Sequence, residues 1–285
     1  MEIVSLKNMS FGYITDTFLE AFADYDIDID KEQLRAMLSR RGFRPELSFG
    51  AVEDERMVAF TFNGIGNFNG ISTAYDTGTG TLPCYRGRGL ASQIFNEAEG
   101  LLKDAGISQY LLEVLQHNIP AIKIYRSHGF EVTREFNCYT TSDPGEKCLN
   151  HPVLPELTIE EVGINDIVAL GLDRFEDFSP SWQNDNNSIK RASESLRGVV
   201  ANVGDDICGY GITEPASGDI TRIAVSPVWR RKGIGSSILN TLSQFNCYGS
   251  LKVVNVQIDC LSVNAFLKAC GFELKCRQFE MVKRL

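Results

Sequence analysis

A nine-residue segment occurs twice in this chain, as PCYRGRGLA at 83–91 and as PVWRRKGIG at 227–235. In each copy a proline stands three residues before an arginine, an aromatic residue precedes that arginine, and Arg-x-x-Gly-x-Gly/Ala follows. The two arginines, Arg86 and Arg230, are 144 residues apart in a chain of 285, and a Gly-Phe pair repeats 142 residues apart, at 129–130 and 271–272. Two anchors that repeat at nearly one offset predict a duplicated domain.

The boundary between the predicted copies lies in a segment rich in turn-forming residues. Residues 144–156 contain Pro144, Gly145, Pro152 and Pro155, and such a composition is typical of linkers between domains. We therefore expect an N-terminal domain over 1–143, a linker over 144–156 and a C-terminal domain over 157–285.

Hydrophobic periodicity predicts the same order of elements in both halves, and therefore two mixed α/β domains. In the first half the predicted strands are 2–6, 46–52, 57–62, 73–82, 110–115 and 130–136, and the predicted helices are 9–23, 30–40, 90–102 and 119–128. In the second half the predicted strands are 157–161, 198–204, 206–213, 219–225, 251–258 and 272–282, and the predicted helices are 164–174, 186–196, 232–246 and 262–269. The Gly- and Asn-rich residues 64–70 are predicted to form a loop.

Composition excludes several classes of function. The formal net charge of −9 argues against a nucleic-acid partner, which needs clustered Lys and Arg. No apolar run of 18 residues is present, so no membrane span is expected. The eight cysteines form no Cys-x-x-Cys pair and the three histidines have no ligand-like spacing, so no metal is predicted. Scattered cysteines without a signal peptide predict reduced thiols in the cytoplasm.

The repeated segment has the chemistry of a phosphate site. A glycine-rich turn that follows a strand and opens a helix leaves backbone N–H groups unpaired at the positive end of the helix dipole. The basic residues Arg86, Arg88, Arg230, Arg231 and Lys232 add charge that suits a polyphosphate. A Walker loop would need Gly-Lys-Ser/Thr, and a dinucleotide fingerprint would need Gly-x-Gly-x-x-Gly; neither is present at these turns.

The first copy, with the residues that follow it, resembles the GCN5-related N-acetyltransferases (the GNAT family). The segment Pro83–Ala91 resembles the family's pyrophosphate-binding motif, and Asn118-x-x-Ala121-x-x-x-Tyr125-x-x-x-Gly129-Phe130 is similar to its downstream motif. The apolar strand Leu112–Leu115 stands between them, where the family's fifth strand belongs. The resemblance covers roughly residues 72–136.

The resemblance implies a central sheet whose fourth and fifth strands part to admit acetyl-coenzyme A. The backbone of Arg86, Gly87, Arg88, Gly89, Leu90 and Ala91 would hold the pyrophosphate. The strand end with Thr79, Thr81 and Leu82 would pair with the pantetheine arm and polarise the thioester carbonyl. Asn118 would contact the pantetheine or cap the next helix.

The implied reaction is acyl transfer from sulfur to nitrogen, which needs a base for the amine and an acid for the leaving thiolate. In the family, a tyrosine at the position of Tyr125 protonates the sulfur; a phenol suits this role because its pKa of about 10 keeps it protonated at neutral pH. Glu113 is the first candidate for the base by its position on a cleft strand, and Asp76 and His117 are alternatives.

The second half matches less fully. Val225, Arg230, Arg231, Lys232, Gly233, Ile234 and Gly235 repeat the strand end and the phosphate turn. However, the position of Tyr125 holds Leu267 and that of Asn118 holds Cys260. We therefore expect the first half to be the catalyst, acting on a primary amine of a small molecule or peptide.

Alternatives remain at this stage. Catalysis in the second half, a module that senses acyl-coenzyme A without turnover, and transfer of a longer acyl chain are each compatible with the sequence. The acidic run Asp24, Asp26, Asp28 and Asp30 either attracts a cationic acceptor or forms a solvated loop.

Overall fold

The computed structural model describes residues 1–24, 29–143 and 154–285, which form two compact units. The first unit comprises Met1–Thr133 together with Phe279–Leu285, and the second comprises Arg134–Gln278. The predicted boundaries at 143 and 157 therefore differ from the observed division. The reason is strand pairing. β6 (Glu131–Thr141) pairs antiparallel with β11 (Leu251–Gln257), whereas at the end of the chain the Leu285 N–H donates to the Ser108 carbonyl of the first unit at 3.0 Å. Most of the predicted linker, 144–153, lies outside the described residues.

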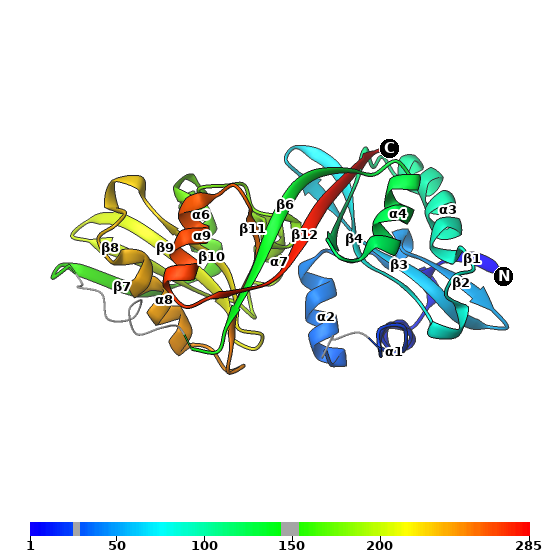
Figure 1. The fold of residues 1–285 in the computed structure, drawn as a ribbon, viewed down its shortest axis with the longest axis horizontal. Coiled ribbons are helices and arrows are strands. Elements are labelled where there is room, and N and C mark those ends of the chain that lie inside the picture. The colour runs from blue at the N-terminus through cyan, green and yellow to red at the C-terminus, as the bar shows by residue number, and fades with distance from the viewer. Residues whose placement is uncertain (25–28, 144–153) are drawn as a thin grey trace. The chain divides into compact units, whose positions relative to one another are not determined.

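In the first unit Figure 1 shows α1 and α2 on one side of the sheet and α3 and α4 on the other. Its strands follow the order β1-β2-β3-β4-β5, and the end of β12 (Glu273–Arg284) adds to β5. The elements are β1 (Glu2–Ser5), α1 (Phe11–Ala21), α2 (Lys31–Arg40), β2 (Phe49–Glu53), β3 (Arg56–Phe68), β4 (Ile71–Thr81), α3 (Leu90–Asp104), β5 (Gln109–Leu115) and α4 (Ile119–Ser127).

Local sequence explains where these helices begin. Asp30 and Gln33 form a reciprocal capping box at the start of α2, as the Asp30 cap predicted. The Asn118 side chain accepts a hydrogen bond from the Ala121 N–H at 3.3 Å and so caps α4. Of the two roles expected for Asn118, the structure therefore shows the cap.

The predicted loop at 64–70 is wrong, because β3 continues through it to Phe68 and only Asn69 and Gly70 form the turn into β4. Gly64 is needed inside this strand for a packing reason. A Cβ at Gly64 would lie 2.0 Å from the carbonyl oxygen of Arg41, and Gly64 also bridges to Phe43. Gly64 therefore allows the Arg41 backbone to approach β3 closely and does not mark a loop.

The sheet of the first unit opens between β4 and β5. Their parallel pairing covers only Thr73–Asp76 with Gln109–Leu112, while β4 runs on to Thr81 and β5 to Leu115. At this fork β4 carries a bulge, because Asn63 pairs with Asp76 and Phe62 with Gly78, leaving Thr77 as the extra residue.

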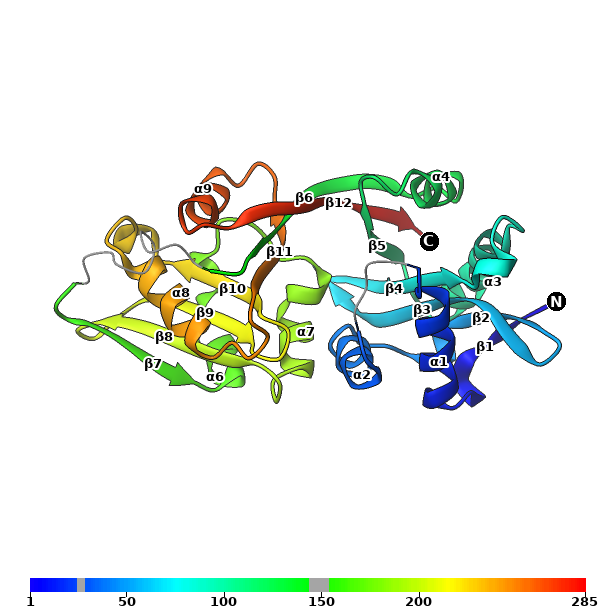
Figure 2. The same cartoon turned by 60° about the horizontal axis from the view of Figure 1, so that its bottom comes forward.

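The second unit repeats this plan. Its strands follow the order β7-β8-β9-β10-β11-β6, with the first part of β12 beside β6 (Figure 2). The elements are β7 (Leu157–Val162), α6 (Ile164–Ala169), α7 (Asn186–Arg191), β8 (Arg197–Val203), β9 (Asp206–Glu214), β10 (Asp219–Val225), α8 (Ile234–Gln244), β11 (Leu251–Gln257) and α9 (Leu261–Ala269). The helices predicted at 164–174 and 186–196 are both shorter than expected.

The sheet of the second unit is buried on both faces. Val199 of β8 belongs to a core with Ile238 and Leu242 of α8, whereas the adjacent Val200 packs with Ile164 of α6 and Ile189 of α7. This alternation is the period of two that a strand imposes.

The fork of the second unit is wider. Parallel pairing of β10 with β11 is confined to Asp219 with Lys252, and a bulge at Thr221 repeats the bulge at Thr77. A splayed mixed sheet flanked by helices is thus present in both units, as the sequence predicted.

Candidate active site and cofactor cleft

Both repeated turns present backbone donors at the start of a helix. Gly87 and Gly89 have φ angles of 78° and 73°, and Arg231 and Gly233 have 63° and 83°. Gly89 and Gly233 precede α3 and α8, and neither helix has a side-chain cap. Successive left-handed residues before a helix turn the N–H groups toward one concave site, which is suited to an anion.

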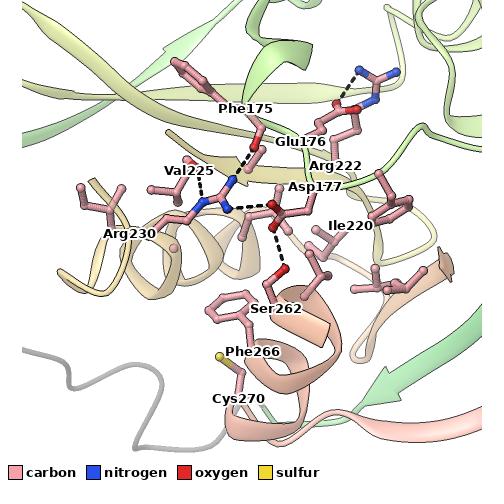
Figure 3. A pocket seen from close by; sticks show the side chains of 18 of the residues that line it. Phe175, Glu176, Asp177, Ile220, Arg222, Val225, Arg230, Ser262, Phe266 and Cys270 are labelled. Atoms are coloured by element: carbon pink, nitrogen blue, oxygen red, sulfur yellow. Dashed lines mark hydrogen bonds and ion pairs between the residues drawn. The ribbon is translucent and has the colours of Figure 1, made fainter. Parts of the chain in front are cut away.

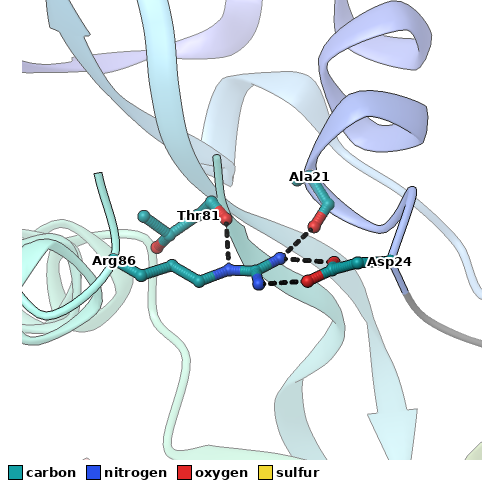
Figure 4. A network of polar contacts seen from close by, with 4 residues as sticks. All are labelled: Ala21, Asp24, Thr81 and Arg86. Atoms are coloured by element: carbon teal, nitrogen blue, oxygen red, sulfur yellow. Dashed lines mark hydrogen bonds and ion pairs between the residues drawn. The ribbon is translucent and has the colours of Figure 1, made fainter. Parts of the chain in front are cut away.

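The side chain of Arg86 connects this turn to the end of α1 (Figure 4). Its Nε donates to the Thr81 carbonyl at 3.2 Å, and its Nη2 donates to the Ala21 carbonyl at 2.9 Å and to Asp24 Oδ1 at 2.7 Å. The Arg86 hydrogen bonds lower the pKa of the Asp24 carboxyl. Asp24 was expected only as part of an acidic run; Asp26 and Asp28 of that run lie outside the described residues.

Arg230 repeats the arrangement in the second unit (Figure 3). Its Nε donates to the Val225 carbonyl at 2.9 Å, its Nη2 donates to the Phe175 carbonyl at 3.0 Å, and its Nη1 pairs with Asp177 at 2.7 Å. Asp177 also accepts from Ser262 of α9 at 2.7 Å. The guanidinium groups of Arg86 and Arg230 therefore each join a strand end to a preceding segment and its carboxylate.

The last basic residue of each turn lies over the aromatic residue of the same turn. The Arg88 guanidinium is 4.6 Å from the ring centroid of Tyr85, and the Lys232 ammonium is 4.3 Å from that of Trp229. Leu90 and Ile234 are buried and anchor α3 and α8. The turns thus expose mainly backbone donors and the edges of stacked cations.

Polar groups gather at the fork of the first unit. Asp76, the last residue of β4 that pairs with β5, accepts from the Gly78 N–H at 2.9 Å and from the Thr79 hydroxyl at 2.7 Å. Hydrogen bonding from the Tyr125 hydroxyl also lowers the pKa of Asp76. Burial raises the pKa of Asp76 to about 6, although these hydrogen bonds oppose the shift. Tyr125 is itself 9% exposed and packs edge-on against Phe95.

The other candidates for the base lie near this cluster or on the surface. Glu113 is half-buried on β5 and is hydrogen-bonded to the Tyr75 hydroxyl, and burial raises the pKa of Tyr75 well above its usual value. His117 is exposed in the turn before α4. The structure therefore brings Asp76, Thr79 and Tyr125 together, with Glu113 on the neighbouring strand.

The second unit contains a cavity of about 790 Å³ between the parted strands β10 and β11. It reaches the turn before α8 at Arg230, Arg231 and Gly233 and is bounded by α9 at Val263 and Phe266. Its volume is in the range of small-molecule sites.

One wall of this cavity holds a buried ion pair that no sequence motif indicated. Arg222 Nη1 pairs with Glu176 at 2.8 Å, and the Arg222 guanidinium also donates twice to the Asn184 carbonyl, at 2.8 and 2.6 Å. The Tyr210 hydroxyl donates to Glu176. Burial raises the pKa of Glu176 despite the neighbouring Arg222. Because these groups satisfy one another, they form a fixed polar wall.

Three further observations concern classes of site. Over the described ranges, no group of three or more His, Cys, Asp or Glu could hold a metal ion. Nor does any described helix combine the length and hydropathy needed to cross a membrane. Among the cysteines that the structure describes, six are free thiols, whereas Cys270, at the edge of the cavity, is disulfide-bonded, which departs from the prediction of reduced thiols.

Comparison with known proteins agrees with this geometry in both units. The family model "Acetyltransferase (GNAT) family" matches residues 13–130, and the model "Acetyltransferase (GNAT) domain" matches residues 194–274. The chain is a tandem member of the GNAT family. No curated protein matches the sequence at a significant level.

Solved structures share the tandem fold at low sequence identity. A tandem GNAT protein from the clavulanic acid biosynthesis pathway is 16% identical, with a TM-score of 0.74 over 99% of this chain and 98% of that one. A GCN5-related N-acetyltransferase from Sphaerobacter thermophilus is 15% identical, with a TM-score of 0.69 over 95% and 91%. A putative acetyltransferase from Pyrococcus horikoshii is 14% identical, with a TM-score of 0.72 over 100% and 89%. These likenesses concern the fold.

Within this tandem GNAT protein the two units differ where the strands part. The two units can be aligned by the bulges at Thr77 and Thr221 and by the carbonyls, Thr81 and Val225, that Arg86 and Arg230 bond. This alignment makes Asp76 equivalent to Ile220 and Thr79 equivalent to Ile223. The helix ends also align, because the Phe130 N–H bonds to the Tyr125 carbonyl as the Phe272 N–H bonds to the Leu267 carbonyl. The polar cluster of the first unit is thus aliphatic in the second.

Proposed function

We propose that this chain is an N-acetyltransferase that moves an acetyl group from acetyl-coenzyme A to a primary amine, and that its first unit performs the transfer. The observation that supports this proposal is the polar cluster at the fork of β4 and β5, where the buried Asp76 accepts from Thr79 at 2.7 Å and Tyr125 is among the groups that lower its pKa. We take Tyr125 as the phenolic proton donor to the thioester that a GNAT fold admits at this fork. The acceptor is an amine of a small molecule or a peptide.

The donor is held mainly by backbone groups. Residues 86–91 supply the N–H groups for the pyrophosphate, and the free edge of β4 at Thr79, Thr81 and Leu82 pairs with the pantetheine arm. In the second unit Val225 and residues 230–235 provide the corresponding groups. Arg86 and Arg230 support their turns through the contacts described above, and their charge favours an anion nearby.

The reaction needs two proton transfers, one from the attacking amine to a base and one from an acid to the leaving sulfur. Glu113 accepts the proton that the attacking nitrogen loses as its bond to the carbonyl carbon forms. Tyr125 donates its proton to the sulfur as the carbon–sulfur bond breaks, and Asp76 holds the phenol in place. The products are an amide and the free thiol of coenzyme A. A proton returned through solvent from Glu113 to Tyr125 resets the site.

Release of coenzyme A in the presence of a panel of amines tests this function. The wild-type chain should release thiol with at least one class of amine, and Gly89→Glu should lose most of that activity, because a carboxylate then faces the phosphate site. Gly106→Glu is a matched control: Gly89 and Gly106 flank the same helix, have φ angles of 73° and 76°, and have no heavy atom within 4 Å of an added Cβ. Equal activity of the two variants would contradict the proposal.

A further inference from the structure

We propose that the second unit binds an acyl-coenzyme A whose acyl group is apolar and longer than acetyl, and retains it without transfer. This inference rests on the proposed function, which takes coenzyme A thioesters as the ligand and the first unit as the catalyst. It concerns a second function of the chain, namely selective binding of a thioester by a unit that has lost the transfer chemistry.

The first step is the equivalence of the two forks. Leu82 N–H bonds to the Val58 carbonyl at 2.9 Å, as Ser226 N–H bonds to the Cys208 carbonyl at 2.9 Å. Together with the repeated bulges and arginine contacts, this aligns β4 with β10 residue by residue. A ligand that follows the first fork therefore has an equivalent path in the second.

The second step is the loss of proton-transfer groups along that path. Tyr125 corresponds to Leu267, which is fully buried and has no proton to donate. Glu113 corresponds to Val254, because Leu111 pairs with Tyr75 as Lys252 pairs with Asp219; Val254 is apolar and lines the cavity. Asp76 corresponds to Ile220, which is 1% exposed. The second unit therefore has no proton-transfer group in place of Tyr125, Glu113 or Asp76.

The third step is the character of the cavity. Four of its five charged residues form two ion pairs, Arg222 with Glu176 and Arg230 with Asp177, and the fifth, Arg231, belongs to the turn before α8. Most of the remaining lining is aliphatic or aromatic: Phe175, Phe178, Ile220, Ile223, Val225, Val253, Val254, Val256, Val263, Phe266 and Ala269. An aliphatic chain buried against this surface gains about 0.8 kcal/mol per methylene, which corresponds to about fourfold in affinity.

Calorimetric titration of Gly89→Glu with coenzyme A and with acetyl-, butyryl- and hexanoyl-coenzyme A tests the inference, because binding to this variant reports the second unit. We expect one ligand per chain and a dissociation constant that falls about fourfold for each added methylene. In the same background Ile223→Thr, which restores the polarity of Thr79, should weaken hexanoyl-coenzyme A more than acetyl-coenzyme A. Ile258→Thr, at an exposed isoleucine, is the matched control.

Each outcome is decisive. The inference would be overturned if Gly89→Glu bound none of the ligands, or bound them with affinities that do not depend on acyl-chain length. It would also be overturned if Ile223→Thr and Ile258→Thr had equal effects, or if Gly89→Glu released thiol with amines as fast as the wild type. A titration of the wild-type chain, which should show two sites, provides the same test if Gly89→Glu does not fold. If the wild type transfers acetyl to an amine but the affinity of the second unit does not depend on acyl-chain length, only this inference is refuted. If that affinity rises with chain length but the wild type transfers acetyl to no amine, only the proposed function is refuted.

Discussion

The Tyr125 hydroxyl and the Asp76 carboxyl interact where β4 and β5 part, because hydrogen bonding from Tyr125 is among the causes that lower the pKa of Asp76 against the effect of burial. The two residues are far apart in the sequence, yet they place a phenol and a carboxyl with a pKa of about 6 at one point of the cleft. In the second unit the corresponding residues, Leu267 and Ile220, are both buried hydrocarbons. This difference is the basis of our proposal that the first unit transfers the acyl group and the second only binds it.

Asp76 should make the free energy of unfolding depend on pH. Its pKa is about 6 when folded and 3.8 ordinarily, so the folded state binds the proton more tightly and stability falls as pH rises between these values. Relative to Asp76→Asn, the wild type should lose roughly 3 kcal/mol between about pH 4 and about pH 7. Urea denaturation of both proteins at the two pH values measures this difference, and a rise instead of a fall would contradict the assignment.

Arg230 should stabilise the second unit through the geometry of its guanidinium group. Arg230→Lys keeps the charge but cannot reproduce the bonds to the Val225 and Phe175 carbonyls, so it should reduce the free energy of unfolding by about 1–2 kcal/mol. Arg231→Lys, at the exposed neighbouring position, should change it by less than about 0.5 kcal/mol. Thermal denaturation compares the two, and equal shifts in Tm would show that the contacts do not matter.

Gly64 should be required for packing in β3. Gly64→Ala brings a methyl group within 2.0 Å of the Arg41 carbonyl oxygen and should cost about 1–3 kcal/mol. Gly100→Ala, in α3 with open space around its Cβ, should instead stabilise the protein by about 0.5–1 kcal/mol. Opposite shifts in chemical denaturation are expected; a neutral Gly64→Ala would show that β3 and Arg41 are not in contact.

Features that depend on local sequence could be predicted. The glycine-rich turns, the caps at Asp30 and Asn118 and the order of strands and helices follow from residue type and spacing over a few positions. The repeat itself predicted two domains of similar order, and the resemblance to the GNAT family implied that their sheets are splayed.

Features that depend on distant contacts could not be predicted from spacing. Which unit β6 and the end of β12 join depends on pairing between residues more than a hundred positions apart. The Asp24 and Asp177 partners of the repeated arginines and the Arg222–Glu176 pair also depend on contacts between residues distant in the sequence. Gly64 was assigned to a loop because only the folded structure shows the carbonyl that it must admit.

The rate of a single acetyl transfer by Tyr125→Phe tests the central claim most directly. With acetyl-coenzyme A and a reactive amine both saturating, the rate should fall about 100-fold or more, because removal of the phenolic hydroxyl leaves the sulfur without its acid. Tyr248→Phe, at a tyrosine that is 52% exposed in the second unit, should keep the wild-type rate. A rate for Tyr125→Phe within about twofold of the wild type would contradict the assignment of the chemistry to the first unit.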